Sequence, residues 1–252
     1  MTKGWANSER GWVMGDLVGG GNAILLLLTA MMVVGTGIVA VLAARRKELR
    51  VARTFLGAGA IIAVAYAGGV IAASAASTER TLASGETKWF CGFYLDCHLG
   101  LSLDKVEMVT ELPGQGVPLQ ARGNFHILTL QLHNSAKNPN IDMLLYRPDV
   151  RIVDASGTKY ERSADAEAVL AYGIQAARPP ILAAETKVTH QPTQATIAFD
   201  LPANVQGARL IVTEGWIVDK VIELGLINDE NSIFHQRTYI ALDSNDARTA
   251  MR

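Results

Sequence analysis

The sequence predicts a two-helix transmembrane hairpin followed by a mainly-β soluble domain, an antiparallel β-sandwich with a short helical insertion. Two observations predict the hairpin: residues 17–44 and 54–77 are uncharged apolar runs, and a short basic segment joins them. A third observation predicts the sandwich, because short strand-like segments separated by turn-forming residues follow from residue 88 onward.

Each apolar run is long enough to cross a membrane. A helix needs about 20 apolar residues to span about 30 Å of hydrocarbon, whereas a helix buried in a soluble domain is usually shorter and carries a charged face. The predicted parts of the chain are an N-terminal segment (1–16), two spans (17–44 and 54–77), their loop (45–53), a polar connector (78–87) and a soluble domain (88–252).

The distribution of basic residues predicts the orientation of the hairpin. The N-terminal segment holds only Lys3 and Arg10, whereas the loop between the runs holds five basic residues: Arg45, Arg46, Lys47, Arg50 and Arg53. Short loops rich in Lys and Arg face the cytoplasm. We therefore expect a bacterial inner-membrane protein whose two termini and soluble domain lie in the periplasm.

Two features near the predicted outer surface admit alternative interpretations. Aromatic residues flank the runs and either lie in the headgroup layer or pack inside the protein: Trp5, Trp12, Trp89 and Phe90. The basic loop, the second run and Ala73-Ser74-Ala75 also resemble the three regions of a signal peptide, and cleavage there would release the soluble domain. We favour the uncleaved hairpin.

The second run is rich in small residues that recur at four-residue spacing, in the rows Gly59, Ala63, Ala67 and Ala65, Gly69, Ala73. Such rows let helix backbones approach closely. Rows on several faces predict more helical neighbours than the first run can supply. The expected partners are membrane lipid and other membrane-protein subunits, although a general preference for Ala in membrane helices would produce the same pattern.

Neither run contains an Asp, Glu, Lys, Arg or His residue. Ionisable residues inside a membrane usually mark proton paths, ion sites and substrate routes, and a His would be needed as an axial ligand for haem or chlorophyll. The hairpin is therefore predicted to be an anchor or packing element, with no cofactor, and a transporter or channel is disfavoured.

The two cysteines, Cys91 and Cys97, follow the second run on the side predicted to be oxidising. A structural disulfide that closes a small loop is the favoured interpretation. A metal site that includes His98, or a redox pair, is the alternative. The spacing does not match the C-x2-C pattern of zinc and thioredoxin-like sites.

The soluble domain is predicted to consist mainly of antiparallel strands. The clearest strand is 124–134, where apolar residues alternate, and 149–154 with 159–162 reads as a hairpin around a Gly-containing turn. Ser163 is predicted to cap a short helix that ends before Gly173. Further strands are predicted at 99–112, 186–200, 207–214 and 232–242.

Part of this domain resembles a known family. The strand 124–134, the hairpin 154–160, the segment 195–203 (Ala-Thr-Ile-Ala-Phe-Asp-Leu-Pro-Ala) and the segment 208–212 (Ala-Arg-Leu-Ile-Val) resemble uncharacterised bacterial immunoglobulin-like domains of lipoproteins and membrane-anchored proteins. The resemblance covers about half of the soluble domain. It implies an immunoglobulin-like sandwich outside the cytoplasm and carries no catalytic residues. The two apolar runs, the cysteine loop and the insertion 163–180 depart from the simplest members.

The sequence shows no pattern that predicts a catalytic, cofactor or metal site. His126 and His133 are seven residues apart on one predicted strand, so their side chains point to opposite faces. Ser102, Ser135 and Ser232 lack a nucleophile-elbow setting. The acidic segment 228–231 lacks the spacing of a calcium loop and is predicted to be a solvated turn. Net charge is −1, which favours neither nucleic acid nor another strongly charged partner.

The segment 215–227 is apolar and lies between the last predicted strands. Trp216, Val218, Ile222 and Leu226 would form either part of the core or an exposed rim for docking another protein.

These observations together predict a non-catalytic accessory or scaffold subunit of a multi-subunit bacterial membrane complex, with a photosynthetic or respiratory complex as the expected host. No small-molecule substrate is predicted. One alternative is a membrane-anchored envelope module that binds or senses a small ligand or peptide. An enzyme whose site is assembled from scattered His, Asp and Ser residues ranks below both.

Overall fold

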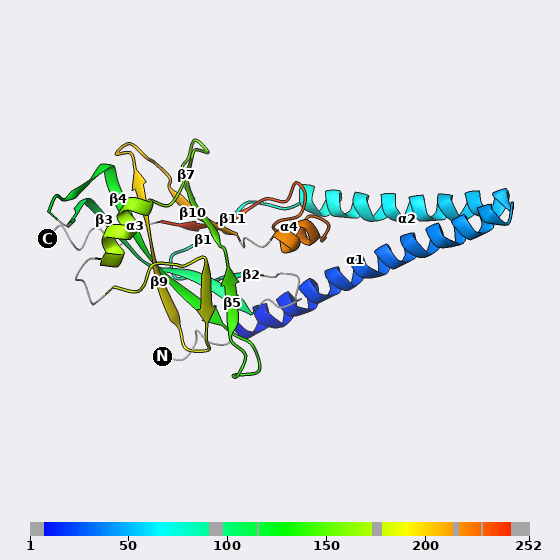
Figure 1. Ribbon diagram of the computed structural model, residues 1–252, viewed down its shortest axis with the longest axis horizontal. Coiled ribbons are helices and arrows are strands. Elements are labelled where there is room, and N and C mark those ends of the chain that lie inside the picture. The colour runs from blue at the N-terminus through cyan, green and yellow to red at the C-terminus, as the bar shows by residue number, and fades with distance from the viewer. Residues whose placement is uncertain are drawn as a thin grey trace. The chain divides into compact units, whose positions relative to one another are not determined.

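The computed structural model describes residues 8–90, 98–114, 116–172, 178–213, 217–227 and 229–242, with side chains omitted for 8–20 and 217–219. It divides into two units. The first contains the helical hairpin and the segment Ile217–Gln236. The second contains the strands, in Glu79–Phe90, His98–Trp216 and the residues after Gln236 (Figure 1).

The hairpin consists of two long helices, α1 (Ser8–Arg45) and α2 (Leu49–Ala75). Gly21–Arg45 and Leu49–Ala75 have mean hydropathies of 2.6 and 2.0 and are long and apolar enough to cross a membrane. The connection is shorter than the predicted loop 45–53, because α2 already includes Arg50 and Arg53. Arg is a good helix former, and its long side chain can extend toward polar surroundings from a helix.

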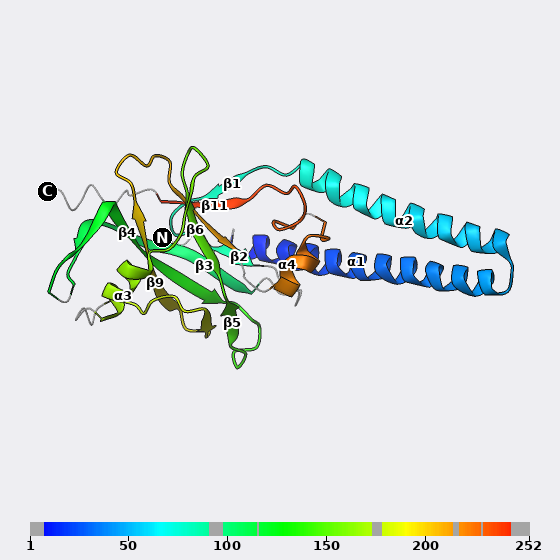
Figure 2. The same ribbon diagram turned by 45° about the horizontal axis from the view of Figure 1, so that its top comes forward.

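A third helix, α4 (Ile217–Glu223), belongs to the same unit as the hairpin. In both views α1 and α2 lie close at their connection and separate toward their other ends (Figures 1 and 2). In Figure 1, α4 lies between the separated ends. The segment that contains α4 connects two paired strands of the other unit, β10 (Arg209–Thr213) and β11 (Thr238–Ala241).

The second unit is a sandwich-like β domain. One sheet has the order β1-β11-β10-β6-β7, the next has the order β2-β3-β4-β9, and β5 pairs with β8 in a small third sheet. All named pairs are antiparallel except β1 with β11. The remaining bounds are β1 (Arg80–Leu82), β2 (Lys88–Phe90), β3 (Leu99–Leu112), β4 (Leu119–Asn134), β5 (Met143–Tyr146), β6 (Asp149–Val153), β7 (Lys159–Tyr160), β8 (Glu185–Val188) and β9 (Thr193–Leu201).

The core lies between the two larger sheets. Alternate residues of β3, β4 and β9, such as Leu101, Leu130 and Ile197, pack with Ile152 and Leu210 of the opposite sheet, and all five are fully buried. This period of two is the pattern that a strand with one buried face requires.

The opposite face of the second sheet is partly covered by α3 (Ala164–Tyr172). Ala166 of α3 packs with Phe125, Ile127 and Ala198 in a smaller cluster. Ser163 Oγ accepts a hydrogen bond from the backbone N–H of Ala166 at 3.3 Å. The predicted helix and its cap are therefore confirmed.

The mainly-β class, the hairpin of β6 with β7 and the bounds of β3 are also confirmed. Three short strands and the helix α4 were missed. β1 lies in the predicted connector, β2 contains two of the aromatics that flank the second run, and β5 is too short to show a period. Phe90 lies in the core because its strand pairs with β3, which agrees with the alternative that it packs inside the protein.

Candidate functional site

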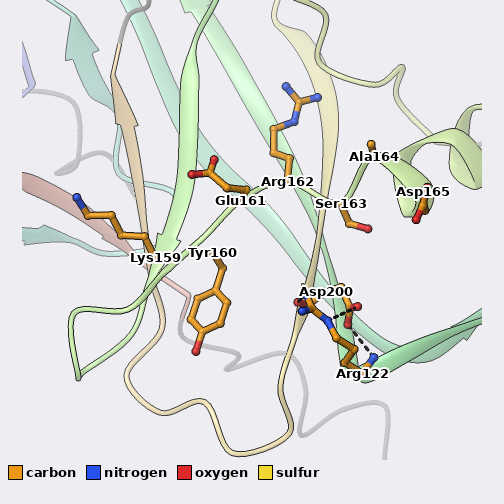
Figure 3. Close-up of a pocket in the computed structure, with 9 residues that line it drawn as sticks. All are labelled: Arg122, Lys159, Tyr160, Glu161, Arg162, Ser163, Ala164, Asp165 and Asp200. Atoms are coloured by element: carbon orange, nitrogen blue, oxygen red, sulfur yellow. Dashed lines mark hydrogen bonds and ion pairs between the residues drawn. The ribbon is translucent and has the colours of Figure 1, made fainter.

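An open recess of about 520 Å³ lies on the β domain, where the start of β4, the β7–α3 connection and the end of β9 meet. The residues that line it are drawn in Figure 3: Arg122, Lys159, Tyr160, Glu161, Arg162, Ser163, Ala164, Asp165 and Asp200. Their three cations and three carboxylates balance in charge.

The two arginines of the recess are held by carboxylates. Arg122 Nε donates to Asp200 Oδ2 at 2.9 Å, and the backbone N–H of Arg122 donates to Asp200 Oδ1 at 2.9 Å. Arg162 Nε and Nη2 donate to the two carboxylate oxygens of Glu167 at 2.7 and 2.9 Å. These paired, planar contacts join neighbouring elements of the domain.

The side chains around the recess do not converge. Lys159, Tyr160 and Arg162 point in three different directions (Figure 3). A catalytic constellation needs a nucleophile and a base within hydrogen-bond reach of each other and of one reacting atom. The recess, as far as its described lining shows, is an open polar surface without that geometry.

Asp154 organises the hairpin beside the recess. Its Oδ1 accepts hydrogen bonds from the backbone N–H groups of Ser156 at 2.8 Å and Thr158 at 2.9 Å, and Tyr160 donates its hydroxyl hydrogen to Oδ2 at 2.9 Å. The hydrogen bond from the Ser156 hydroxyl is the main cause that lowers the pKa of Asp154. Burial, followed by the Asp154 carboxylate, raises the pKa of Tyr160. This network fixes the turn around Gly157, whose φ is +85°.

One serine and one histidine lie together in a way that the sequence analysis missed. Ser102 Oγ is 2.9 Å from His133 Nε2, because Gly100 pairs with His133 and Ser102 follows on the same face of β3. Burial lowers the pKa of His133. The Ser102 side chain is nearly buried, at 4% exposure for the residue, and it lies within a regular strand. A nucleophilic serine instead needs an exposed hydroxyl on a sharp turn.

Lys88 is a buried cation between the two larger sheets. It lies on β2 and is 5% exposed. Its Nζ donates to the carbonyl oxygen of Val212 at 2.7 Å and lies 3.5 Å from that of Thr238, on β10 and β11 of the other sheet. The ring of Phe90 is 5.8 Å away. Lys88 therefore links the two layers of the domain.

The histidines described by the structure serve local packing. His98 Nδ1 is 3.3 Å from Ser135 Oγ, and His190 Nε2 is 2.7 Å from the carbonyl oxygen of Ala136. Among the described residues, no group of three His, Cys, Asp or Glu side chains is placed to hold a metal ion. Cys91 and Cys97 lie outside the described residues, so their disulfide stays a prediction.

The described residues of the acidic segment, 229–231, form a half-buried turn where a solvated one was predicted. Asp229 Oδ1 accepts the backbone N–H of Asn231 at 2.8 Å, and the Asn231 amide donates to Glu223 Oε2 at 2.9 Å. These bonds direct polar groups toward the protein.

The hairpin presents a broad apolar surface. Only 6% and 11% of the residues in the most apolar windows of its two helices are buried. Large side chains on both helices are more than half exposed, including Met31, Ile38, Ile61 and Val64. The core helix of a soluble protein would bury such residues.

Of the two predicted rows of small residues, Gly59 forms the close helix contact. A Cβ at Gly59 would lie 2.6 Å from Thr36 Oγ1 of α1. Gly69 and Ala73 are half-buried, whereas Ala63, Ala65 and Ala67 are exposed. The exposed members remain predicted contacts for a further partner.

The segment after α4 is hydrogen-bonded to both long helices. Asn22 Nδ2 donates to the carbonyl oxygen of Ile227 at 2.6 Å, and the Tyr66 hydroxyl donates to that of Gly225 at 2.8 Å. The hydroxyls of Ser74 and Ser232 are 3.0 Å apart. The sequence carried no signal for this packing, since the partners are more than 150 residues apart.

Of the four predicted docking residues, the side chains of Ile222 and Leu226 are described, and neither is exposed. Leu226 is 5% exposed and Ile222 is half-buried. Trp216 and the side chain of Val218 lie outside the described part of the chain. Residues 217–223 of this segment form α4, which the sequence analysis did not predict.

Comparisons with solved structures return distant similarities to bacterial proteins. The yjhA protein from Bacillus subtilis aligns with 65% of this chain and 100% of its own, at 14% identity and a TM-score of 0.40. An uncharacterised β-sandwich protein from Clostridium difficile aligns with 66% of this chain and 96% of its own, at 8% identity and a TM-score of 0.33. A secreted protein from Mycobacterium tuberculosis aligns with 56% of this chain and 93% of its own, at 16% identity and a TM-score of 0.35.

These likenesses are too weak to carry an argument about this chain. No protein-family model matches it, and no curated protein matches it in sequence. The fold assignment rests on the sheet order and the shared core described above, and it is a mainly-β, sandwich-like domain accompanied by two long apolar helices.

Proposed function

We propose that α1 and α2 cross a bacterial inner membrane and anchor the β domain in the periplasm. The observation that carries this proposal is the exposed apolar surface of the hairpin, which needs either lipid or protein to cover it. The basic residues at the α1–α2 connection support a cytoplasmic connection.

The function proposed for the anchored chain is that of a non-catalytic accessory or scaffold subunit of a multi-subunit membrane complex. Two properties support it. The described membrane helices carry no ionisable residue between Gly21 and Ala44, or between Thr54 and Ser77. The two arginines of the recess are bonded to carboxylates of the β domain. An immunoglobulin-like sandwich that docks partners, and a photosynthetic or respiratory host, are parts of the same proposal.

The test is purification of the tagged full chain from its native membrane in mild detergent. A stoichiometric set of co-purifying membrane subunits is expected, and mass spectrometry identifies them. The exposed row of small residues supplies a matched pair of variants: Ala65→Leu should reduce recovery of a helical partner, whereas Leu56→Ala, on an exposed larger residue, should not. Recovery of a monodisperse monomer would contradict the scaffold role.

The recess supports a second candidate function, an envelope module that binds a small polar ligand. A volume of about 520 Å³ falls in the range of small-molecule sites. If this is the function, ligand binding to the purified full chain should be lost in Lys159→Ala, because Lys159 is exposed at the recess, and kept in Lys137→Ala, because Lys137 is exposed elsewhere.

A further inference from the structure

In the segment from α4 to Gln236, large apolar side chains are exposed and an acidic side chain is buried. Among its residues with described side chains, the large apolar ones Val221, Leu224, Ile233 and Phe234 are 63, 50, 45 and 68% exposed. Gln236 is the one fully exposed polar residue in that described set, and the charged residues Lys220, Asp229 and Glu230 are half-buried. The acidic residue Glu223 is only 3% exposed. A surface that faces water shows the opposite arrangement.

The hydrogen bonds of this segment place it at a definite height on the hairpin. Measured from Thr54, the first residue after the basic cluster, Tyr66 lies about 18 Å along α2 and Ser74 about 30 Å, at a rise of about 1.5 Å per residue. The hydrocarbon layer is about 30 Å thick. Ser74, which contacts Ser232, is therefore at the outer boundary of the layer, and Tyr66, which contacts Gly225, lies about 12 Å inside it.

The backbone of the segment is satisfied in the manner that such a depth requires. Non-helical backbone inside a membrane is tolerated only where protein groups pair its N–H and C=O groups. The carbonyl oxygens of Gly225 and Ile227 accept hydrogen bonds from Tyr66 and Asn22. The N–H groups of Gly225 and Leu226 donate to the carbonyl oxygens of Ile222 and Glu223, both at 3.0 Å.

We propose that residues 217–236 form a re-entrant membrane element that enters the outer leaflet between α1 and α2, and that Val221, Leu224, Ile233 and Phe234 contact phospholipid. The proposal rests on the proposed membrane anchoring and adds a third membrane-embedded element to it. Lipid is the occupant because the apolar surface continues that of the hairpin, and because Glu223 and its partner Asn231 are turned inward.

The test replaces single residues of the full chain with the photocrosslinker p-benzoylphenylalanine and reconstitutes each protein in phosphatidylcholine–phosphatidylglycerol nanodiscs. The test sites are Val221 and Phe234. Ile61, 71% exposed on α2, is the positive control, and Val117, 80% exposed on the β domain, is the negative control. After illumination, mass spectrometry measures the fraction of each protein that carries a phospholipid adduct.

The lipid-adduct yield at Phe234 and Val221 should lie within about twofold of that at Ile61 and at least about tenfold above that at Val117. Yields at the level of Val117, or adducts to a second copy of the chain in place of lipid, would overturn the re-entrant element while leaving the anchor intact. A lack of lipid adducts at Ile61 would instead overturn the anchor, so the two proposals fail separately.

Discussion

At the scale of single residues, the polar side chains of the β domain mainly form hydrogen bonds with other groups of the same domain. Lys88 bridges the two sheets, Asp154 fixes a turn, and Ser102 is bonded to His133. The types of these residues would suit an active site, but their burial and mutual bonding assign them to the framework. Lys88 and a further residue of the β domain, His126, make predictions about stability.

Replacing Lys88 should destabilise the domain according to how much of the side chain is removed. Lys88→Ala removes the packed stem and the hydrogen bond from Nζ to the Val212 carbonyl oxygen, and it should lower the free energy of unfolding by about 2–4 kcal/mol. Lys88→Met keeps the stem and should cost less. Urea unfolding of the full chain in detergent, followed by near-ultraviolet circular dichroism, measures both. The control Lys137→Met, at an exposed position, should change little, and an equally small effect of Lys88→Ala would contradict the cross-sheet role.

The half-buried His126 predicts a dependence of stability on pH. Burial lowers the pKa of His126, which lies opposite the core residue Phe199 on β9. As pH falls below about 6.5, the unfolded chain therefore binds protons before the folded chain does. The contribution of neutral His126 to stability is complete above that pH and declines as pH falls toward the lower pKa of the folded state.

The expected result is that the free energy of unfolding decreases between pH 7.5 and pH 5.5, and that His126→Leu reduces this decrease. The same urea titrations at several pH values measure it. His235→Gln is the control, because His235 is bonded to the adjacent Gln236 outside the sandwich core, and it should keep the wild-type slope. An unchanged slope in His126→Leu would show that other groups cause the dependence.

At the scale of elements, Gly59 is the buried member of the predicted small-residue rows on α2. Gly59 is buried against Thr36, whereas a Cβ at Gly57, one half-turn earlier, would meet nothing within 4 Å. This difference explains why only part of the predicted small-residue pattern is used inside the chain. The other exposed small residues of α2 lie on faces that α1 does not cover.

Gly59→Leu should therefore force α1 and α2 apart, whereas Gly57→Leu should not. Overpacking a close contact costs about 1–3 kcal/mol, and a leucine that faces lipid costs little. The midpoint of thermal unfolding in mild detergent should fall in Gly59→Leu and stay near that of the wild type in Gly57→Leu. Equal midpoints would show that the two helices do not depend on this contact.

At the scale of the whole molecule, the proposed topology places the basic connection in the cytoplasm and the β domain in the periplasm. Single cysteines at Lys47 and Val117, in a chain with Cys91→Ser and Cys97→Ser, report the two sides. A membrane-impermeant maleimide should modify Val117→Cys in intact spheroplasts and should modify Lys47→Cys only after lysis. The reverse pattern would contradict the orientation, and modification of both in intact spheroplasts would contradict the hairpin.

The sequence alone determined the parts of this protein that depend on local patterns. Apolar length predicted both long helices, alternation predicted β3 and β4, and a serine before a helix predicted the start of α3. These features need only neighbouring residues to form, so they are visible in the order of the chain.

The tertiary structure alone decided which distant groups meet. The pairing of Ser102 with His133 depends on strand register, the bridge from Lys88 to Val212 depends on how two sheets stack, and the contact of Tyr66 with Gly225 joins residues 159 positions apart. Each of these contacts joins residues that are far apart in the sequence, and no local pattern encodes which distant segments meet. For that reason the re-entrant segment was visible in the sequence only as an apolar stretch between two strands.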